Sequence, residues 1–447
     1  MNVISRDKCI IFILILEILS INALPSSSKA LNIAVIGAGA AGLASAKNAL
    51  EQGHNVVIYE KTKALGGIWW YTDETGKDEY GINIHTAMYQ GLRTNLPYQT
   101  MEYPGHKYPN NTRSFPPHEV VLKYLNSYAE RFDLKRLIKF HHIVDKIHSL
   151  QNDRWMIVVK DLPNNKTVSA IYDAVFVCIN RFSSPNYPQF EGADFFKGKI
   201  MHSHDYRRAE DFRDENVLVI GSGNSGMDIV LQLSKTANRV TWSRRKPKEP
   251  TEEERRVYGD TVTFKNDVER LISNGVEFMD GTHQNFTVII CATGYRFTYP
   301  MLDVDTGIQI DDNFVQPLYK QTLNINHPTM AFIGMTGTNF IFDLQVRFAL
   351  KFISGTKKLP SKSEMLKDLQ DFVEDRQKKG IPKSRYYHIG LLDKEYYEKV
   401  AQTADITKIP DVYLAICKDL FQSDPFRYRE YKYTIIDDKT FKKEREV

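Results

Sequence analysis

Two glycine-rich turns in this sequence have the residue types and the spacing of a phosphate-binding loop. The first turn follows the apolar run Leu31–Ile36, and it reads Gly37, Ala38, Gly39, Ala40, Ala41 and Gly42. In such a loop the first glycine makes the tight turn, the second lets the backbone approach a pyrophosphate, and the third lets the next helix pack close to the strand. The helix then directs its free N–H groups at the phosphates. The residues of this turn are therefore candidate ligands of a dinucleotide.

A carboxylate completes the first unit. Gly53 ends the predicted helix, and the strand-like run His54–Tyr59 leads directly to Glu60, which lies 18 residues after Gly42 (60 − 42). A carboxylate at the end of this second strand can accept hydrogen bonds from both ribose hydroxyl groups, and it repels a 2′-phosphate. The unit therefore predicts FAD or NAD rather than NADP, with Glu60 as the ribose ligand.

The second turn is followed by the opposite charge at the corresponding place. It comes after the apolar run Asn216–Ile220, and it offers as dinucleotide ligands Ser222, Gly223, Asn224 and Ser225. The next strand-like run, Asn238–Ser243, ends in Arg244, Arg245 and Lys246. A guanidinium forms a bidentate, charge-assisted pair with a phosphate, so this unit predicts NADPH, with Arg244 and Arg245 as 2′-phosphate ligands. A solvated run of surface charge is the alternative interpretation.

The segment between the two turns carries a family resemblance. It contains Phe196, Gly198, His202 and Tyr206. This spacing resembles Phe-x-Gly-x-x-x-His-x-x-x-Tyr/Phe, the linker fingerprint of the flavin-containing monooxygenases, and the likeness extends along nearly the whole chain after the N-terminal segment. The resemblance implies that the linker helps to hold NADP. It also implies that His202 is a structural histidine rather than an acid–base catalyst.

Two further segments contribute site residues through resemblance. The run Leu65–Trp69 resembles the Gly-Gly-x-Trp segment that lies over FAD in two-dinucleotide flavoproteins, which makes Ile68 and Trp69 cofactor ligands. An ordinary glycine loop is the alternative. The stretch Thr-Asn-Leu-Pro resembles the family segment whose asparagine lies beside the flavin ring. Carried over, it implies a catalytic role for Asn95 and a cofactor contact for Thr94, although the same stretch alone would read as a turn.

The chemistry implied by the family is an oxygenation with two cofactors. NADPH passes a hydride to FAD, and the reduced flavin reacts with O2 to give a C4a-hydroperoxyflavin that oxygenates a nitrogen or sulfur atom. The segment Thr336–Phe340 resembles a helix start that faces the flavin and stabilises negative charge on it. The implied partners are O2 and a small-molecule substrate such as a tertiary amine. No metal site is implied, and a homo-oligomer is left open.

The predicted fold class is α/β, with two dinucleotide-binding, Rossmann-like domains and the NADPH domain inserted into the FAD domain. We expect a signal peptide over 1–23 and the first part of the FAD-binding domain over 31–188. The NADPH-binding domain is expected over 189–285, and the second part of the FAD-binding domain over 286–447. The charge-rich stretch Arg244–Asp280 is expected to form a solvated helix.

The N-terminus has the charged, apolar, small-residue order of a secretory signal peptide. Arg6 and Lys8 precede an apolar run of about 13 residues that closes on Ile21-Asn22-Ala23. This run is shorter than the roughly 20 residues that span a bilayer, although a membrane anchor or a buried helix is the alternative. We therefore expect a secreted protein without a membrane partner. Its candidate glycosylation sites are Asn110, Asn165 and Asn285.

Composition and the N-terminal signal narrow the function further. A net charge of +4, without a tract of basic and aromatic residues, gives no argument for nucleic acid. Secreted arthropod members of the family N-oxygenate plant pyrrolizidine alkaloids such as senecionine, and the resemblance to that group predicts alkaloid detoxification here. An S-oxygenating or Baeyer–Villiger monooxygenase and a catalytically degenerate flavin-binding protein are the alternatives. Tyr206 argues against the Baeyer–Villiger fingerprint, which ends in His-x-x-x-Trp/Pro.

Overall fold

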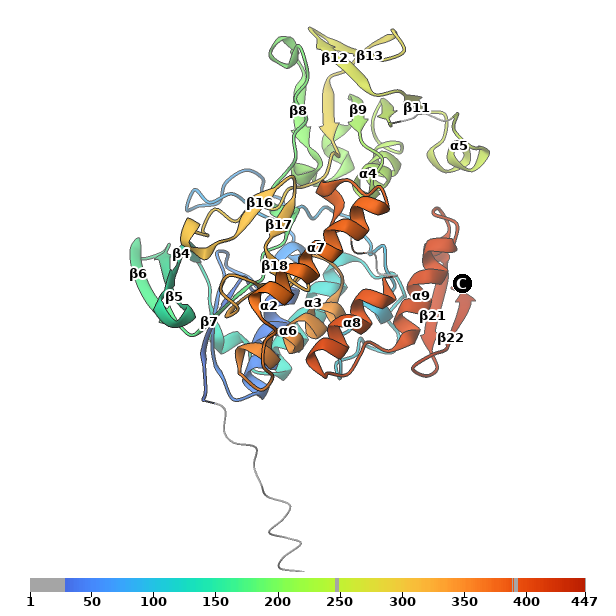
Figure 1. The fold of residues 1–447 in the computed structure, drawn as a ribbon. Coiled ribbons are helices and arrows are strands. Elements are labelled where there is room, and N and C mark those ends of the chain that lie inside the picture. The colour runs from blue at the N-terminus through green and yellow to red at the C-terminus, as the bar shows by residue number, and fades with distance from the viewer. Residues whose placement is uncertain (1–28, 246–248, 388, 390–392, 447) are drawn as a thin grey trace, which may run out of the picture.

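The computed structural model describes residues 29–245, 249–387, 389 and 393–446 (Figure 1). The predicted signal peptide, residues 1–23, and Lys246 lie outside the described residues. Two sheets organise the chain, a seven-stranded sheet in the larger, lower lobe of Figure 1 and a five-stranded sheet in the smaller, upper lobe. Each contains a strand–glycine turn–helix unit, so the predicted α/β class with two Rossmann-like units is confirmed.

The larger sheet has the strand order β18-β19-β20-β7-β1-β2-β3. Its strands are β1 (Asn32–Ile36), β2 (Asn55–Tyr59), β3 (Ile138–Lys139), β7 (Ala174–Val177), β18 (Leu318–Tyr319), β19 (Leu323–Asn324) and β20 (Met330–Phe332). The central strands β1, β7 and β20 run parallel and are almost wholly buried, as parallel strands between two layers must be. Because parallel strands end at the same edge of a sheet, the segments that follow these three strands lie close together.

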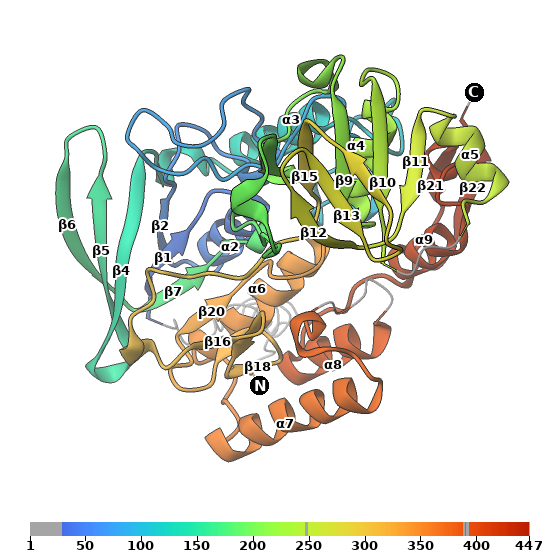
Figure 2. The ribbon, with the colours of Figure 1, turned by 90° about the horizontal axis from the view of Figure 1, so that it is seen from above.

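Helices α2 (Ala40–Glu51) and α6 (Asn339–Ile353) follow β1 and β20 and pack against each other (Figure 2). The Asn48 side chain of α2 donates a hydrogen bond to Asp343 of α6 at 2.9 Å, and Arg347 pairs with the same carboxylate at 2.7 Å. Both helices therefore begin at the carboxyl edge of the larger sheet, where their N-termini can act on one ligand.

The smaller sheet has the order β11-β10-β9-β15-β8, and all its neighbouring strands are parallel. Its elements are β8 (Lys199–His202), β9 (Asn216–Ile220), α4 (Asn224–Leu233), β10 (Arg239–Ser243), β11 (Val262–Lys265) and β15 (Val288–Cys291). The predicted boundary at residue 286 was wrong for β15, because this apolar strand is held between β9 and β8. The chain therefore leaves the smaller sheet after Cys291.

The charged stretch Arg244–Asp280 forms the expected solvated helix only over α5 (Glu252–Tyr258), and the described residues after it form strands and connecting loops. Among its described residues only α5 is helical. It is followed by β11 and by an antiparallel sheet made of β12 (Val268–Ile272), β13 (Gly275–Phe278) and β14 (His283–Asn285). The reason is that Leu271, Val276 and Phe278 face one side and pack into an apolar cluster, a pattern that the many charges between them conceal.

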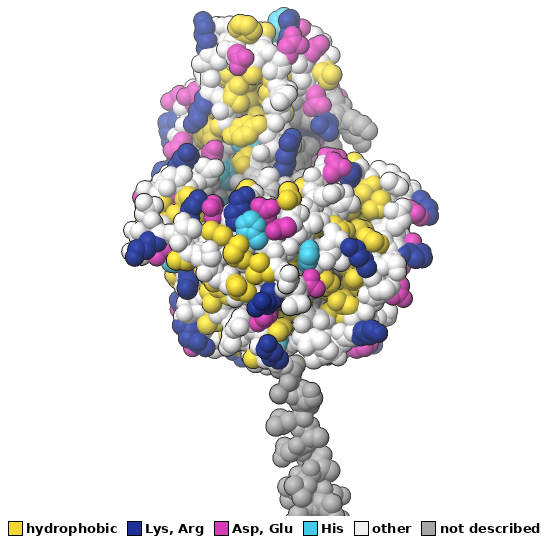
Figure 3. Space-filling model, turned by 60° about the vertical axis from the view of Figure 1, so that its left-hand side comes forward, with side chains coloured by type: hydrophobic (Ala, Val, Ile, Leu, Met, Phe, Trp, Pro, Cys, Tyr) yellow, Lys and Arg dark blue, Asp and Glu magenta, His cyan; other side chains and the backbone are white. Residues whose placement is uncertain are grey.

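The remaining helices and strands lie outside the seven-stranded and the five-stranded sheet. They are α3 (His118–Arg131), β4 (His142–Leu150), β5 (Arg154–Asp161), β6 (Lys166–Tyr172), β16 (Gln309–Asp311), β17 (Phe314–Gln316), α7 (Lys362–Lys378), α8 (Lys394–Ala404), α9 (Asp411–Gln422), β21 (Tyr431–Ile435) and β22 (Phe441–Arg445). Acidic and basic side chains are mixed over the face shown in Figure 3. No helix within the described ranges has both the length and the apolar character needed to cross a bilayer.

Candidate active site

The first glycine turn joins β1 to α2 through close backbone contacts. Gly37 has φ 101°, and its N–H donates to the Tyr59 carbonyl oxygen at 2.8 Å. A Cβ atom at Gly42 would lie 1.9 Å from the Gly37 carbonyl oxygen, so only glycine permits this approach. Gly39 is the N-cap of α2, and no described side chain caps the helix there. Its first N–H groups are therefore available to a phosphate.

The Gly-Gly-x-Trp segment folds over this turn. The Gly66 N–H donates to the Ala38 carbonyl oxygen at 2.9 Å, and a Cβ atom at Gly67 would lie 3.0 Å from the Gly39 Cα. The buried residues of the turn are Ala38, Ala40, Ala41 and Gly42. The segment ends in the two predicted ligands that this contact brings beside the turn, the half-buried Ile68 and Trp69.

Glu60 lies at the end of β2 as predicted, and it is 5% exposed. Its Oε2 accepts the Ala38 N–H at 2.9 Å, and its Oε1 accepts the N–H and the hydroxyl of Thr62 at 2.9 and 2.8 Å. Oε2 keeps a second lone pair for one ribose hydroxyl group, whereas Oε1 faces two Thr62 donors, of which the hydroxyl can instead give its one proton to the Ala64 carbonyl oxygen at 3.0 Å. The carboxylate can therefore take one ribose hydroxyl as it stands, and a second only in exchange for a Thr62 bond.

Two polar atoms at the carboxyl edge of the larger sheet are buried without a partner among the described residues, namely Asn180 Oδ1 and Thr338 Oγ1. Asn180 follows β7 and donates through Nδ2 to the Gly334 carbonyl oxygen at 2.8 Å. Thr338 is the N-cap of α6, and a Cβ atom at Gly334 would lie 2.7 Å from the Ala41 Cβ. Leaving such a group unpaired costs about 1–3 kcal/mol, so this edge fits a polar cofactor group.

Of these two residues only Thr338 lay in a segment that the sequence had marked, Thr336–Phe340. Asn180 was missed as a functional candidate. The signal that could have found it is its position just after a central parallel strand, because ligands of α/β folds bind at the carboxyl ends of such strands.

The Thr94–Asn95 segment is held mainly by its backbone. The Thr94 N–H donates to the Pro116 carbonyl oxygen at 3.0 Å, and its carbonyl oxygen accepts from Arg429 at 3.3 Å. The Thr94 hydroxyl oxygen is buried and has no partner among the described residues, which fits the predicted cofactor contact. Asn95 is exposed, and its side chain forms no hydrogen bond to the described residues. Its catalytic role stays a prediction.

The second glycine turn repeats the backbone of the first without its cover. The Gly221 N–H donates to the Ser243 carbonyl oxygen at 3.1 Å, and a Cβ atom at Gly226 would lie 2.2 Å from the Gly221 carbonyl oxygen. Gly223 is the N-cap of α4, and a Cβ atom placed there would have no described atom within 4 Å apart from those of Gly223 and its chain neighbours. The predicted ligands of this turn are exposed or half-buried, and they are Ser222, Gly223, Asn224 and Ser225.

The two arginines that follow β10 have different surroundings. Arg244 lies over the adjacent rings of Trp242 and Phe264, at 4.8 and 4.6 Å from their centroids, and it pairs with Glu254 through Nη1. Its side chain is 15% exposed, whereas that of Arg245 is 89% exposed. The predicted phosphate clamp is therefore unequal. Arg245 is open to a phosphate, while Arg244 has Nη1 on Glu254 and keeps only a buried Nη2 without a partner among the described residues.

Packing explains the linker fingerprint. A Cβ atom at Gly198 would lie 2.6 Å from the Phe196 ring, so glycine lets that ring fold back on the linker. Tyr206 is fully buried, and its hydroxyl donates to a side chain of α4 at 2.9 Å. His202 is also fully buried, and burial together with the nearby His204 lowers the pKa of His202 to about 4. Its Nδ1 accepts the backbone N–H of His204 at 3.0 Å. A neutral, backbone-bonded imidazole agrees with the predicted structural role.

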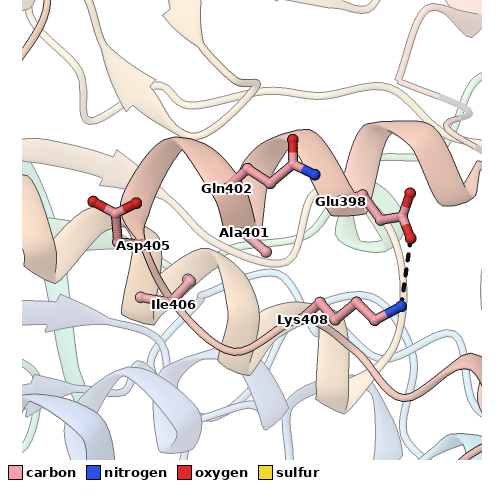
Figure 4. Close-up of a pocket in the computed structure, with 6 residues that line it drawn as sticks. All are labelled: Glu398, Ala401, Gln402, Asp405, Ile406 and Lys408. Atoms are coloured by element: carbon pink, nitrogen blue, oxygen red, sulfur yellow. Dashed lines mark ion pairs between the residues drawn. The ribbon is translucent and has the colours of Figure 1, made fainter.

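A surface pocket elsewhere in the larger lobe contains none of the predicted site residues. It has a volume of about 370 Å³ and is lined by Glu398, Ala401, Gln402, Asp405, Ile406 and Lys408 (Figure 4). An ion pair of 3.5 Å between Glu398 and Lys408 closes one side of it. Small-ligand sites are mostly apolar and enclosed, so the two glycine turns remain the candidate site.

Comparisons with known proteins agree with this geometry. A family model described as flavin-binding monooxygenase-like matches residues 30–249 and 251–421. Senecionine N-oxygenase of Tyria jacobaeae is 34% identical over 440 residues, which cover 97% of this chain and 96% of that protein. Flavin-containing monooxygenase FMO GS-OX4 of Arabidopsis thaliana is 34% identical over 405 residues, or 87% of each chain. The structure of S-allyl-L-cysteine S-oxygenase from Allium sativum has a TM-score of 0.83 and 29% identity, covering 90% of this chain and 95% of its own.

Proposed function

This chain belongs to the flavin-containing monooxygenase family, and from that membership we propose that it N-oxygenates a tertiary amine, with plant pyrrolizidine alkaloids as the substrate class. The protein is an NADPH-dependent flavin monooxygenase with FAD and NADPH as its cofactors. Two further parts of the proposal follow: the substrate atom that is oxygenated, and the compartment in which the protein acts.

One observation carries the choice of nitrogen. The similarity to senecionine N-oxygenase extends over 97% of this chain, whereas the similarity to the plant GS-OX4 enzyme, at the same 34% identity, extends over 87%. Senecionine is an alkaloid whose basic nitrogen is a tertiary amine, and the lone pair of such a nitrogen is a soft nucleophile suited to oxygen transfer. Conversion to the N-oxide would remove the basic lone pair and detoxify the alkaloid.

The residues of the two turns divide the work of binding. When bound, FAD and NADPH supply hydride transfer and the activation of O2. The N–H groups at the start of α2 would hold one pyrophosphate, and those at the start of α4 the other. Glu60 would accept a ribose hydroxyl group, and Arg245 would meet the 2′-phosphate. Thr94, Asn180 and Thr338 would offer buried polar atoms to the cofactor, and the Gly66–Gly67 backbone would help to keep water from it.

Secretion is the second part of the proposal, and the residue order of segment 1–23 supports it. Asn110 and Asn165 are exposed in turns, whereas Asn285 lies in β14 and the Thr287 hydroxyl of its sequon already donates to the Asn216 carbonyl oxygen at 3.2 Å. Expression in insect cells tests this. We expect the protein in the medium, with glycans at the first two sites that a peptide N-glycosidase removes; retention of the whole chain inside the cells would contradict it.

A product screen tests the oxygenation. Purified protein with NADPH and O2 is offered senecionine, a thioether and a ketone, and products are read by mass spectrometry. We expect the amine to stimulate NADPH oxidation and to gain one oxygen atom. A sulfoxide in place of the N-oxide would favour a second candidate, S-oxygenation, which the structural similarity to the Allium sativum S-oxygenase supports. An ester from the ketone would favour Baeyer–Villiger oxidation, and a bound flavin that NADPH never bleaches would favour a degenerate carrier.

A further inference from the structure

A charged junction outside both glycine turns joins three segments that lie far apart in the sequence. Asp228 is on α4 of the smaller lobe, Tyr89 precedes the Thr94–Asn95 segment, and Arg429 lies just before β21. The Arg429 Nη1 pairs with Asp228 Oδ1 at 3.3 Å, and the Tyr89 hydroxyl donates to Asp228 Oδ2 at 2.7 Å. Each oxygen of one carboxylate thus receives a donor from a different segment outside the smaller sheet.

Arg429 also holds the backbone immediately before Asn95. Its Nε donates to the Thr94 carbonyl oxygen at 3.3 Å, and its Nη2 donates to the Arg93 carbonyl oxygen at 3.2 Å. A guanidinium presents its donors in one rigid plane, so this side chain ties two successive peptide groups to Asp228. The side chains of Arg429 and Asp228 are 27% and 15% exposed. Limited exposure keeps such charge-assisted hydrogen bonds effective.

Aromatic contacts keep the junction in place on both sides. Tyr89 is 5% exposed and belongs to the apolar core of the smaller lobe, where its ring lies 5.5 Å from that of Tyr206. Phe426, which precedes Arg429, meets the Tyr258 ring of α5 edge-on at 5.8 Å. The segment that carries Asn95 is therefore anchored to the smaller lobe, and the C-terminal part of the chain supplies the anchor.

We propose that Arg429 is a positioning residue, which fixes Asn95 relative to the NADPH-binding lobe through the carbonyl groups of Arg93 and Thr94. This inference rests on the proposed function, because it matters for catalysis only if Asn95 meets the cofactors. Groups that direct a reaction must be held within a fraction of an ångström of their working position. Asp228 sets that position, since the same carboxylate takes Arg429 and Tyr89 at once.

Arg429→Ala tests the junction, with Arg427→Ala as the matched control. Arg427 is two residues away and pairs with Glu430 at the surface. Hydrogen–deuterium exchange of the full chain should become about three- to tenfold faster over residues 89–97 in the first variant, which is the scale of a lost charge-assisted hydrogen bond. The control should exchange like the parent protein. Equal exchange in the two variants would overturn the proposal.

Coupling gives the readout that a merely structural role would not change. With FAD content and melting temperature matched to the control, Arg429→Ala should release about two- to fivefold more hydrogen peroxide per NADPH oxidised, as expected for a misplaced polar group. Peroxide release equal to that of Arg427→Ala would count against the proposal.

Two milder variants guard against simple misfolding. Arg429→Lys keeps the charge but cannot serve two carbonyl groups and a carboxylate in one plane, so it should restore stability and leave coupling impaired. Asp228→Asn should loosen residues 89–97 to a smaller degree. Full coupling and unchanged exchange in both variants would overturn the proposal. If the parent protein oxidises no NADPH, the proposed function fails, while the exchange data still decide whether Arg429 holds the segment.

Discussion

The two glycine turns have the same backbone construction but differ in what covers them. In each turn the third glycine lies against the carbonyl oxygen of the first, and an uncapped helix begins at the second. A Cβ atom at Gly39 in the first turn would lie 3.5 Å from the Gly67 Cα, whereas one at Gly223 in the second turn would meet no described atom within 4 Å beyond its chain neighbours. The same strand–glycine turn–helix loop therefore occurs twice in this protein, once covered by other backbone (closed) and once exposed (open).

The closed setting suits FAD and the open one suits NADPH. If FAD binds at the first turn, we expect the Gly66–Gly67 segment, which lies against that turn, to slow its release. A cofactor on an exposed turn can bind and leave without such a movement. We therefore expect the packing above each turn to distinguish a permanently bound cofactor from a cosubstrate, and the following experiments test that expectation.

Adding one methyl group to each turn should have the largest effect. The new Cβ atom would lie 1.9 Å from the Gly37 oxygen in Gly42→Ala and 2.2 Å from the Gly221 oxygen in Gly226→Ala. Such overpacking costs about 1–3 kcal/mol or more. We expect Gly42→Ala to purify without flavin, and Gly226→Ala to stay yellow but bind NADPH about 100-fold more weakly. Flavin absorbance measures the flavin content and titration measures the NADPH affinity. Loss of flavin from both variants would contradict the assignment of different cofactors to the two turns.

Acidification should loosen the linker beside the second turn. Burial and the nearby His204 lower the pKa of His202 from 6.5 to about 4, so the folded state prefers the neutral ring. The stability that this preference contributes is complete above about pH 6.5 and is lost as the pH falls toward 4. Its size is about 3 kcal/mol at most.

Melting temperatures measured between about pH 7 and about pH 4.5, a range that includes most of the titration, check this expectation. The parent protein should lose stability more steeply than His202→Gln, which has no ring to protonate. The exposed His283 of β14 provides the control, since His283→Gln should follow the parent curve. Parallel curves for His202→Gln and the parent would show that this ring does not couple folding to pH.

Substituting the two arginines one at a time should show which of them binds a phosphate at the open turn. Because the Arg245 side chain is 89% exposed, Arg245→Ala should raise the KM for NADPH about tenfold, near the strength of one charge-assisted pair, with little change for NADH. Arg244→Ala should mainly lower the melting temperature, because that side chain is held by Trp242, Phe264 and Glu254. Equal changes in KM for NADPH and NADH would refute phosphate recognition here.

The smallest expected effect is in Asn95→Ser. Asn95 is exposed beside the buried Thr94. Loss of its amide would remove at most one or two hydrogen bonds to a bound cofactor. NADPH oxidation should persist, while hydrogen peroxide release rises about threefold, the scale of one neutral hydrogen bond. Steady-state oxidation and peroxide assays measure this. An unchanged yield of oxygenated product would remove Asn95 from the mechanism.

Much of the site could be predicted because steric demands act locally. Gly42 and Gly226 have no room for a Cβ atom, and Glu60 must follow the second strand to reach both turn and ribose, so residue type and spacing carried the information. The part of Arg244–Asp280 that follows α5 was predicted wrongly for the opposite reason. Its few apolar residues pack against the smaller sheet, and the charges around them hide a strand pattern that only packing makes visible.

By itself, the sequence determined that two strand–glycine turn–helix units form, and it predicted which of them binds FAD and which NADPH, because glycine positions and single charges report local geometry. The tertiary structure alone decided how those units are used. Trp242 and Phe264 lie side by side on β10 and β11, and together they withdraw Arg244 from solvent. Contacts between segments hundreds of residues apart, such as Arg429 with Thr94, depend on how the whole chain packs, and no local pattern encodes them.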